Sequence, residues 1–326
     1  MKTIMVTGTG AIIGYGVLRS LRNARPDFKL IAADIFPDAV GQNWADVFEA
    51  APLTSSSSYR SWLRDCIARY SVDLLIPGIE QDVFHYAATP DLFSGLSVCP
   101  VLNRVELIRL CHDKWQMHES LREAGHISRI PSHLSREYDE LCREFGLPFL
   151  LKPRTSYASK GIVRIFSRED FLAQKHKLGS ELMAQPIVGN EDEEYTVGVF
   201  GDGKGGAGAS ITLQRKLSLE GATNKAIVRK IAELDRVVSE LCSIFRPVGP
   251  TNLQFRHAEG RWYLLEINPR ISSSTSLRAA FGYNEAELCV QHYLENKQVK
   301  QPVIRAGHAV RYIADMVTFE NDCTDF

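Results

Sequence analysis

The chain has 326 residues, of which 44% are hydrophobic and 24% charged, a composition that excludes disordered and fibrous proteins. This length predicts two or three domains. The 38 Lys and Arg residues are balanced by 39 Asp and Glu residues, which excludes a strong positive electrostatic field that would attract nucleic acid or anionic membranes. No apolar run reaches the roughly 20 residues that cross a bilayer and no secretory leader is recognisable, so we expect a cytoplasmic protein.

The first region alternates short apolar runs with helical spacing. Strands are predicted at 3–7, 29–34 and 72–76, and the apolar spacing through 17–21 indicates a helix between the first two. This βαβ rhythm predicts a parallel sheet with helices on its faces.

The turn after the first strand has the glycine pattern Gly8-x-Gly-x-x-x-Gly14, and Asp34 follows about 20 residues later. This combination is typical of dinucleotide-binding units, in which a helix N-terminus holds a phosphate. The same glycines also permit a tight turn without any nucleotide. A dinucleotide-dependent oxidoreductase therefore remains an alternative, ranked last.

The middle region reads as a small α/β unit. Asp113 is expected to cap a helix that ends near Gly125. Strands at 148–153 and 161–165 follow, and Ser167 opens a second helix with acidic residues in its first turn.

The third region contains longer strands. The pattern predicts strands at 194–200 and 210–214 with a glycine-rich tip at 201–208 between them, a helix over 225–245, and a hairpin over 251–268.

The most informative cluster lies on that hairpin. Side chains alternate along a strand, so Glu266 and Asn268 share a face, and the turn brings Gln254 to about the same level. One carboxylate and two amide oxygens are ligands that suit Mg²⁺. Arg270 lies two residues beyond Asn268 and is placed to face a phosphoryl group in transfer.

The hairpin, Pro269-Arg270 and the stretch 271–283 resemble the ATP-grasp superfamily, and specifically one synthetase unit of the carbamoyl-phosphate synthase large subunit. The resemblance runs along the whole chain and implies an α/β fold. It implies a preATP-grasp, Rossmann-like domain at 1–112, a lid subdomain at 113–182 and a catalytic subdomain at 183–326, with ATP and Mg²⁺ as cofactors and Mn²⁺ as an alternative ion.

The resemblance also implies contacts to the phosphates of ATP. Lys114 and Lys152 match its phosphate-binding cations, although Lys114 alone also reads as a solvated first-turn lysine. The loop 155–161 matches the glycine-rich flap, with Ser159, Lys160 and Gly161 as contacts. Only one residue of this loop is glycine, so its backbone is expected to wrap the phosphates less closely.

The hinge strand of the family receives adenine. By resemblance, the backbone near Gln185, Pro186 and Ile187 binds the base. The family often has a carboxylate at the position of Gln185 for the ribose hydroxyls, so Glu191 or Glu193 is expected to take that task.

Catalytic roles follow from the same resemblance. Arg270, Lys152 and Arg215 match cations that contact substrate or the transferring phosphoryl group, and Glu194 matches a site carboxylate. The second arginine that carbamoyl-phosphate synthases place three residues after the first is Ser273 here. This departure favours a larger organic carboxylate over bicarbonate.

The resemblance implies an ATP-dependent ligase that activates a carboxylate as an acyl phosphate for attack by an amine. The alternatives on the same site are a small-molecule kinase and a non-catalytic nucleotide-binding subunit. Small-molecule carboxylate and amine substrates are expected, with no nucleic acid or membrane partner, and a homodimer is one option for assembly. Seven dispersed cysteines and nine scattered histidines suggest no zinc site or disulfide framework.

Overall fold

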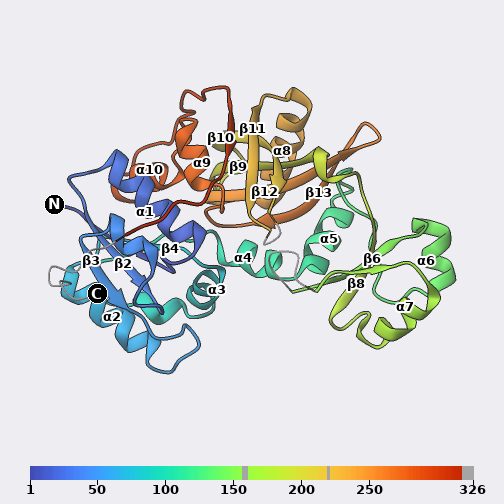
Figure 1. The fold of residues 1–326 in the computed structure, drawn as a ribbon, viewed down its shortest axis with the longest axis horizontal. Helices are drawn as coiled ribbons and strands as arrows, with labels where there is room; N and C mark the ends of the chain where they lie inside the picture. The colour runs from blue at the N-terminus through green and yellow to red at the C-terminus, as the bar shows by residue number, and fades with distance from the viewer. Residues whose placement is uncertain (156–160, 219–220, 318–326) are drawn as a thin grey trace, which may run out of the picture.

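The computed structural model describes residues 1–155, 161–218 and 221–317 (Figure 1). These residues form a five-stranded, a three-stranded and a six-stranded sheet. Among the helices of the described ranges, none combines the length and apolar character that a membrane crossing requires.

The N-terminal sheet is parallel, as predicted, with the order β3-β2-β1-β4-β5. Its strands are β1 Thr3–Thr7, β2 Lys29–Asp34, β3 Val47–Ala50, β4 Leu74–Pro77 and β5 Cys99–Pro100. Its helices are α1 Ile12–Ala24, η1 Val40–Trp44, α2 Tyr59–Tyr70, α3 Glu80–Ala88, η2 Pro90–Phe93 and α4 Val105–His112. The sequence pattern missed β3 and β5, because strands this short carry too little periodicity to recognise.

The glycine turn between β1 and α1 is filled by the protein itself. Asp34 accepts hydrogen bonds from the backbone N–H of Gly10 at 2.7 Å and of Phe36 at 3.0 Å. A Cβ on Gly41 of η1 would lie 2.5 Å from the Cβ of Thr9, so η1 packs directly on the turn. Both carboxylate oxygens of Asp34 are thus used internally, which favours the structural role of these glycines over dinucleotide binding.

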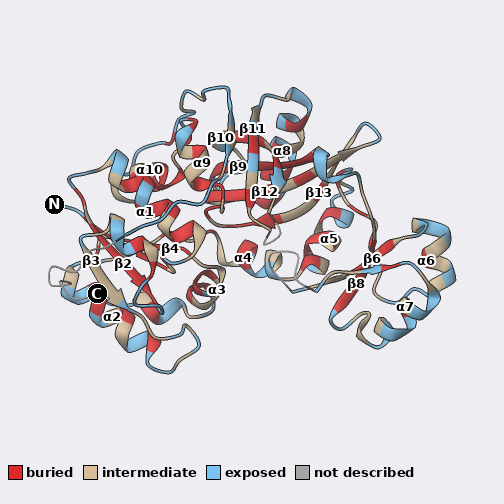
Figure 2. Ribbon diagram, in the orientation of Figure 1, coloured by how far each residue is buried: buried red, intermediate tan, exposed pale blue. Residues whose placement is uncertain are grey.

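The small sheet has the order β7-β6-β8 and stands apart as a lobe at the right of Figure 1. It consists of β6 Phe149–Pro153, β7 Val163–Ile165 and β8 Leu182–Pro186, with the helices α6 Tyr138–Phe145, α7 Arg168–Gln174 and η3 Lys175–Lys177. Helix α5 Lys114–Glu123 precedes this lobe, and its Met117 and Leu121 pack in the core of the six-stranded sheet. The predicted caps are confirmed: Asp113 accepts from the N–H of Trp115 at 2.9 Å, and Ser167 from that of Asp170 at 3.2 Å. Figure 2 shows that α6 and α7 bury only one side and expose the other.

The six-stranded sheet is antiparallel, in the order β13-β12-β9-β10-β11-β14. Its strands are β9 Glu194–Asp202, β10 Ala207–Leu217, β11 Thr223–Arg229, β12 Val248–Ala258, β13 Arg261–Asn268 and β14 His308–Val310. Its helices are η4 Glu191–Glu193, α8 Ala232–Phe245, α9 Thr275–Ala280, α10 Glu285–Cys289 and η5 Val290–Leu294.

The helix predicted over 225–245 is wrong at its start. Residues 223–229 form β11 instead, and the helix begins at Ala232. Pairing with β10 on one side and β14 on the other satisfies the backbone of β11, and its β-branched residues suit a strand. This distant pairing outweighs the local helical spacing.

Helix α1 joins the N-terminal sheet to the six-stranded sheet. A Cβ on Gly16 would lie 3.0 Å from Thr275 of α9, and Arg25 pairs with Glu287 of α10 at 2.7 Å. One buried apolar cluster includes residues of β1, α1, β10 and α10. The two larger bodies therefore share a core, and the segment after β13 lies between them.

Beneath that segment is a fully buried ion pair. Arg278 of α9 and Glu285 of α10 are each 0% exposed, and their charged groups lie 2.9 Å apart. Arg278 also donates to Asn252 at 2.6 Å and to Thr196 at 3.0 Å. The pair thereby ties α9 to β9 and β12.

Replacing Arg278 with Met is expected to lower the free energy of unfolding by about 3–5 kcal/mol, because the Glu285 carboxylate would remain buried without a partner. Urea denaturation measures the change. The double variant Arg278→Met/Glu285→Leu should recover much of the loss, and Arg60→Met, which breaks an exposed pair with Asp91, serves as control. An unchanged denaturation midpoint in the single variant would contradict this expectation.

Candidate active site

The hairpin of β12 and β13 brings the predicted oxygen ligands together. Gln254 lies opposite Glu266, and Asn252 lies opposite Asn268. Gln254 therefore stands at the level of Glu266, as the alternation predicted. A bulge after Gln254 leaves Leu265 without a ladder partner and separates the polar end of the hairpin from the apolar part nearer the turn.

Glu266 is the open carboxylate of this cluster. Among the described residues, no hydrogen bond or ion pair ends on it, although Lys152 and Arg215 lie within its electrostatic reach. Asn268 is buried, its Nδ2 lacks a partner within the described ranges, and its Oδ1 accepts from Arg270 at 3.2 Å. A carboxylate and an amide oxygen of this kind fit a hard divalent cation.

The amide oxygen of Gln254, like that of Asn268, is engaged by an arginine. Oε1 of Gln254 accepts a hydrogen bond from Nη2 of Arg215 at 2.8 Å. In the described part of the chain, no three His, Cys, Asp or Glu residues are grouped to hold a metal. A cation here would depend on Glu266, on amide oxygens and on oxygens of a bound phosphate, a ligand set that Mg²⁺ accepts.

Two lysines approach this cluster, Lys152 from β6 of the small lobe and Lys114 from the start of α5. Nζ of Lys152, on β6, donates to the backbone carbonyl of Leu265 at 3.3 Å. Burial, with a smaller contribution from the positive charge of Lys114, lowers the pKa of Lys152 to about 8, although the attraction of Glu266 opposes the shift. Lys114 is itself buried, at the first position of α5. The predicted phosphate-binding cations are thus brought close to the predicted metal ligands.

Glu194 is held by two arginines beneath the site. The residue is only 4% exposed, and it accepts from Arg215 at Oε1 and from Arg256 at Oε2, each at 3.0 Å. Arg215 is equally buried, and desolvation lowers its pKa. Both residues therefore belong to an internal network of charged groups, and the hydrogen bond from Arg215 fixes the position of the Gln254 side chain.

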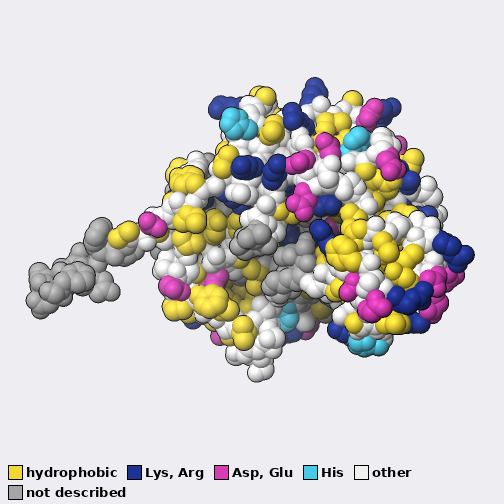
Figure 3. All heavy atoms as spheres, turned by 45° about the vertical axis from the view of Figure 1, so that its right-hand side comes forward, with side chains coloured by type: hydrophobic (Ala, Val, Ile, Leu, Met, Phe, Trp, Pro, Cys, Tyr) yellow, Lys and Arg dark blue, Asp and Glu magenta, His cyan; other side chains and the backbone are white. Residues whose placement is uncertain are grey.

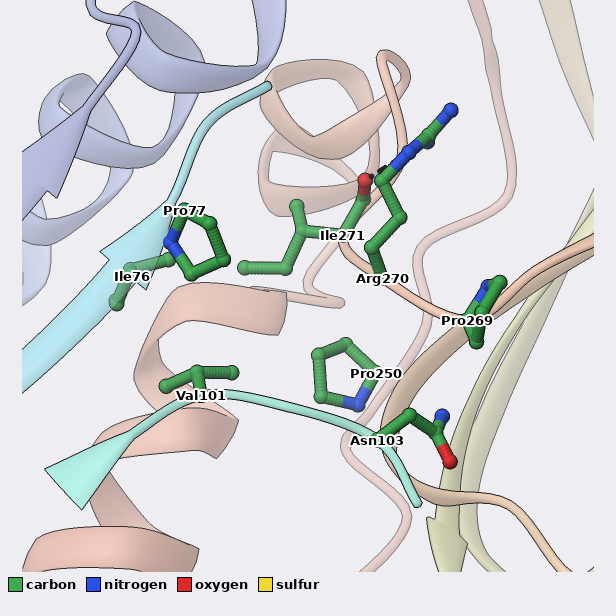
Figure 4. A pocket seen from close by; sticks show the side chains of 8 residues that line it. All are labelled: Ile76, Pro77, Val101, Asn103, Pro250, Pro269, Arg270 and Ile271. Carbon is green, nitrogen blue, oxygen red and sulfur yellow. Dashed lines mark hydrogen bonds between the residues drawn. The ribbon is translucent and has the colours of Figure 1, made fainter. Parts of the chain in front are cut away.

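Arg270 stands where β13 ends. Its Nη2 lies 3.6 Å from Glu80 at the start of α3, and its Nη1 donates to the carbonyl of Ile271 at 3.1 Å. Figure 4 shows the small pocket beside it, lined by Ile76, Pro77, Val101, Asn103, Pro250, Pro269, Arg270 and Ile271. The carboxyl end of β4 and the chain just after β13 thus lie together at this pocket.

The predicted adenine hinge lies on β8 and just beyond it. The side chain of Gln185 is buried and donates to the Ser132 hydroxyl at 2.7 Å, while Pro186 ends the strand. Ile187 follows directly, and Glu191 is exposed on η4. The amide nitrogen of Gln185 is thus engaged within the protein.

The flap is only partly described. Gly161 has a φ of +78°, and a Cβ there would lie 3.0 Å from Pro153, so a glycine suits this position. Ser159 and Lys160 lie outside the described residues. In Figure 3 a hollow with Lys, Arg, Asp and Glu side chains at its edges separates the small lobe from the six-stranded sheet.

Sequence reasoning placed residues 78–86, which include Glu80, at the wall of the substrate pocket, but it missed Arg256 and the pairing of Glu80 with Arg270. Arg256 follows Gln254 by two positions on β12, so the alternation that selected Gln254 also indicates Arg256. Glu80 and Arg270 are 190 residues apart in the sequence, and no local sequence pattern predicts their contact.

Comparison with known proteins agrees with the resemblance. Residues 180–316 match the family described as "ATP-grasp in the biosynthetic pathway with Ter operon". The carbamoyl phosphate synthase large chain of Thermotoga neapolitana is 23% identical over 88% of this chain. The chain spans only 29% of that protein's length.

Solved structures show the same fold. N5-carboxyaminoimidazole synthetase from Staphylococcus aureus, complexed with ADP, superimposes with a TM-score of 0.72 and 19% identity, over 93% of this chain and 80% of that one. A biotin carboxylase from Campylobacter jejuni, in a β,γ-ATP complex, gives 0.72 and 16%, over 94% and 74%. The expected fold is confirmed: the chain has the fold of these synthetase and carboxylase structures, its residues 180–316 match an ATP-grasp family, and it resembles one part of the carbamoyl phosphate synthase large chain.

Proposed function

We propose that the chain is an ATP-dependent ligase that joins a carboxylate to an amine. The observation that carries this proposal is the convergence of Lys114 on α5 and Lys152 on β6 with Glu266 and Asn268 on β13, next to Arg270. Cations opposite hard-oxygen ligands are what phosphoryl transfer requires, since it depends on position and electrostatics.

The reaction has two steps. A carboxylate oxygen of the substrate attacks the γ-phosphorus of ATP, the bond to the bridging oxygen breaks, and ADP leaves. The amine nitrogen of the second substrate then attacks the carbonyl carbon of the acyl phosphate, phosphate leaves with the C–O bond electrons, and the nitrogen loses a proton. The products are an amide, ADP and phosphate.

Each proposed residue has one task. Lys114 and Lys152 bind oxygens of the β and γ phosphates, and Glu266, Asn268 and Gln254 hold Mg²⁺. Bound Mg²⁺ supplies further neutralisation of the phosphate charge. Arg270 stabilises the charge that the carboxylate and the phosphoryl group share during transfer.

The remaining assignments are part of the same proposal. Arg215, expected to contact the substrate, is buried and bonded to Glu194 and Gln254, so we assign it to positioning these two residues instead. The backbone at 185–187 binds adenine with Glu191 near the ribose. Because β8 completes the small sheet, we propose that the lid runs from 113 to Pro186 rather than 182. An acyl phosphate hydrolyses in water, so a lid that excludes water is mechanistically useful.

A phosphate-release screen tests the proposal. Wild-type protein with Mg·ATP is incubated with pairs of organic carboxylates and amines, and release above the ATP-only rate is scored together with amide formation by mass spectrometry. Release that requires both substrates supports a ligase. A phosphorylated carboxylate or alcohol that accumulates without an amine would show a kinase instead, and nucleotide binding without any turnover would show a binding subunit.

Glu266→Gln is expected to slow phosphate release about 100-fold at fixed Mg²⁺, because the loss of a ligand charge weakens stabilisation of the transferring group. The Mg²⁺ concentration for half-maximal release should rise as well. Glu259→Gln, on the exposed turn of the same hairpin, is the matched control. If Glu266→Gln and Asn268→Ala both retain wild-type rates, the metal assignment is wrong.

Binding of ADP near pH 8 is expected to take up about half a proton, because Lys152 has a pKa of about 8 and nearby phosphates favour its charged form. As pH rises through this pKa, the free protein loses the charge and affinity for ADP should fall. Calorimetry in buffers of different ionisation enthalpy measures the uptake. Lys152→Met should abolish it and Lys175→Met should not, so uptake that persists in Lys152→Met would refute the assignment.

A further inference from the structure

Arg154 joins the small lobe to the rest of the chain. It follows directly after β6, and its backbone N–H donates to the carbonyl of Glu181, just before β8, at 2.8 Å. Its own carbonyl accepts from the backbone N–H of Lys114, the first residue of α5, at 2.9 Å. Because α5 packs in the core of the six-stranded sheet, the backbone of Arg154 is bonded to the lobe on one side and to the larger body on the other.

The side chain of Arg154 makes the same connection. Its Nε and Nη2 donate to the two carboxylate oxygens of Asp113 at 3.3 and 2.5 Å, and its Nη1 donates to the carbonyl of Gly179 in the lobe at 2.5 Å. Two parallel hydrogen bonds to one carboxylate fix the orientation of a guanidinium. The side chains of Arg154 and Asp113 are 21% and 18% exposed, against 51% and 68% for the pair of Arg168 and Asp139 on the surface of the lobe. The Asp113–Arg154 pair is therefore well sheltered from solvent.

Asp113 has two tasks at this junction. As the N-cap of α5, its Oδ1 accepts from the backbone N–H of Trp115 at 2.9 Å, and the same oxygen accepts from Nε of Arg154. The capping bond fixes where α5 begins. The ion pair fixes how the lobe is attached at that point, so the start of α5 and the end of β6 are bonded to each other.

The two lysines assigned to the phosphates lie on either side of this junction. Lys114 directly follows Asp113, and Lys152 precedes Arg154 by two positions on β6. The charges of the two lysines lie within electrostatic reach of each other, and Nζ of Lys152 also donates to the carbonyl of Leu265. Like charges repel, so contacts elsewhere must hold the elements that bring these lysines together. The Asp113–Arg154 pair is a contact of this kind.

We propose that Asp113 and Arg154 are positioning residues for the nucleotide. Their ion pair holds the small lobe in the orientation in which Lys152 and Lys114 bind the phosphates of one nucleotide together. This inference rests on the proposed function, and it adds two residues that act through the lysines rather than by contact with the ligand. The ligand class is a nucleoside polyphosphate, so the contribution of the pair depends on the phosphates beyond the first.

Calorimetric titration of the full chain with ADP and with AMP, each with Mg²⁺, tests the inference. Asp113→Asn keeps a good N-cap but removes the negative charge of the pair, and Arg154→Gln removes the positive charge. Each variant should weaken ADP binding about tenfold, the size of one charge-assisted hydrogen bond, and leave AMP binding unchanged, since AMP has no β phosphate. Arg168→Gln, which breaks the exposed pair with Asp139 on the same lobe, is the matched control and should change neither affinity.

The double variant Asp113→Asn/Arg154→Gln separates a shared contact from two independent effects. It should bind ADP no more weakly than the weaker single variant, because both residues act through one ion pair. Additive losses would overturn the inference, and so would wild-type ADP affinity in Asp113→Asn, which decides the matter if Arg154→Gln does not fold. Equal losses for ADP and AMP would show a general effect on the fold and would also overturn it. A wild-type protein that binds neither nucleotide would contradict the proposed function itself.

Discussion

The buried carboxylate of Glu194, shared between Arg215 and Arg256, is the interaction on which the charged site depends. It joins three neighbouring strands, because Glu194 lies on β9, Arg215 on β10 and Arg256 on β12. Two positive charges are balanced by one negative charge, so the floor of the site remains cationic. Removal of Glu194 would leave the buried guanidinium of Arg215 without its carboxylate partner beside the partly exposed Arg256, which is more costly than the loss of an exposed pair.

This excess of positive charge contributes to the lowered pKa of Lys152. Lys152 is surrounded by Lys114 and Arg256, and burial shifts its pKa down although Glu266 and Glu194 oppose the shift. A polyphosphate would reverse this balance, since it adds negative charge where the protein has too little. The site is therefore electrostatically incomplete in the chain alone, and a nucleotide phosphate group is the kind of anion that completes it.

Local signals predicted the parts of the fold that depend on neighbouring residues. Asp113 and Ser167 cap their helices as expected, and the alternation on the hairpin placed Gln254 opposite Glu266. The failures have a common cause. Strand β11 follows from pairing with distant strands, and the contact of Glu80 with Arg270 joins segments that are far apart in sequence. No periodicity within one segment carries that information.

The packing of α1 on α9 and α10 divides the site into a fixed and an adjustable side. Arg270 lies on a segment between two bodies that share one core, and Lys114 opens α5, whose Met117 and Leu121 pack with the six-stranded sheet. Lys152 instead comes from β6 of the small sheet. A rotation of the small sheet would therefore change the distance from Lys152 to Glu266 but leave Arg270 in place. Under the proposed function, such a rotation would loosen the contact of Lys152 with the nucleotide while Arg270 keeps its position beside the second substrate.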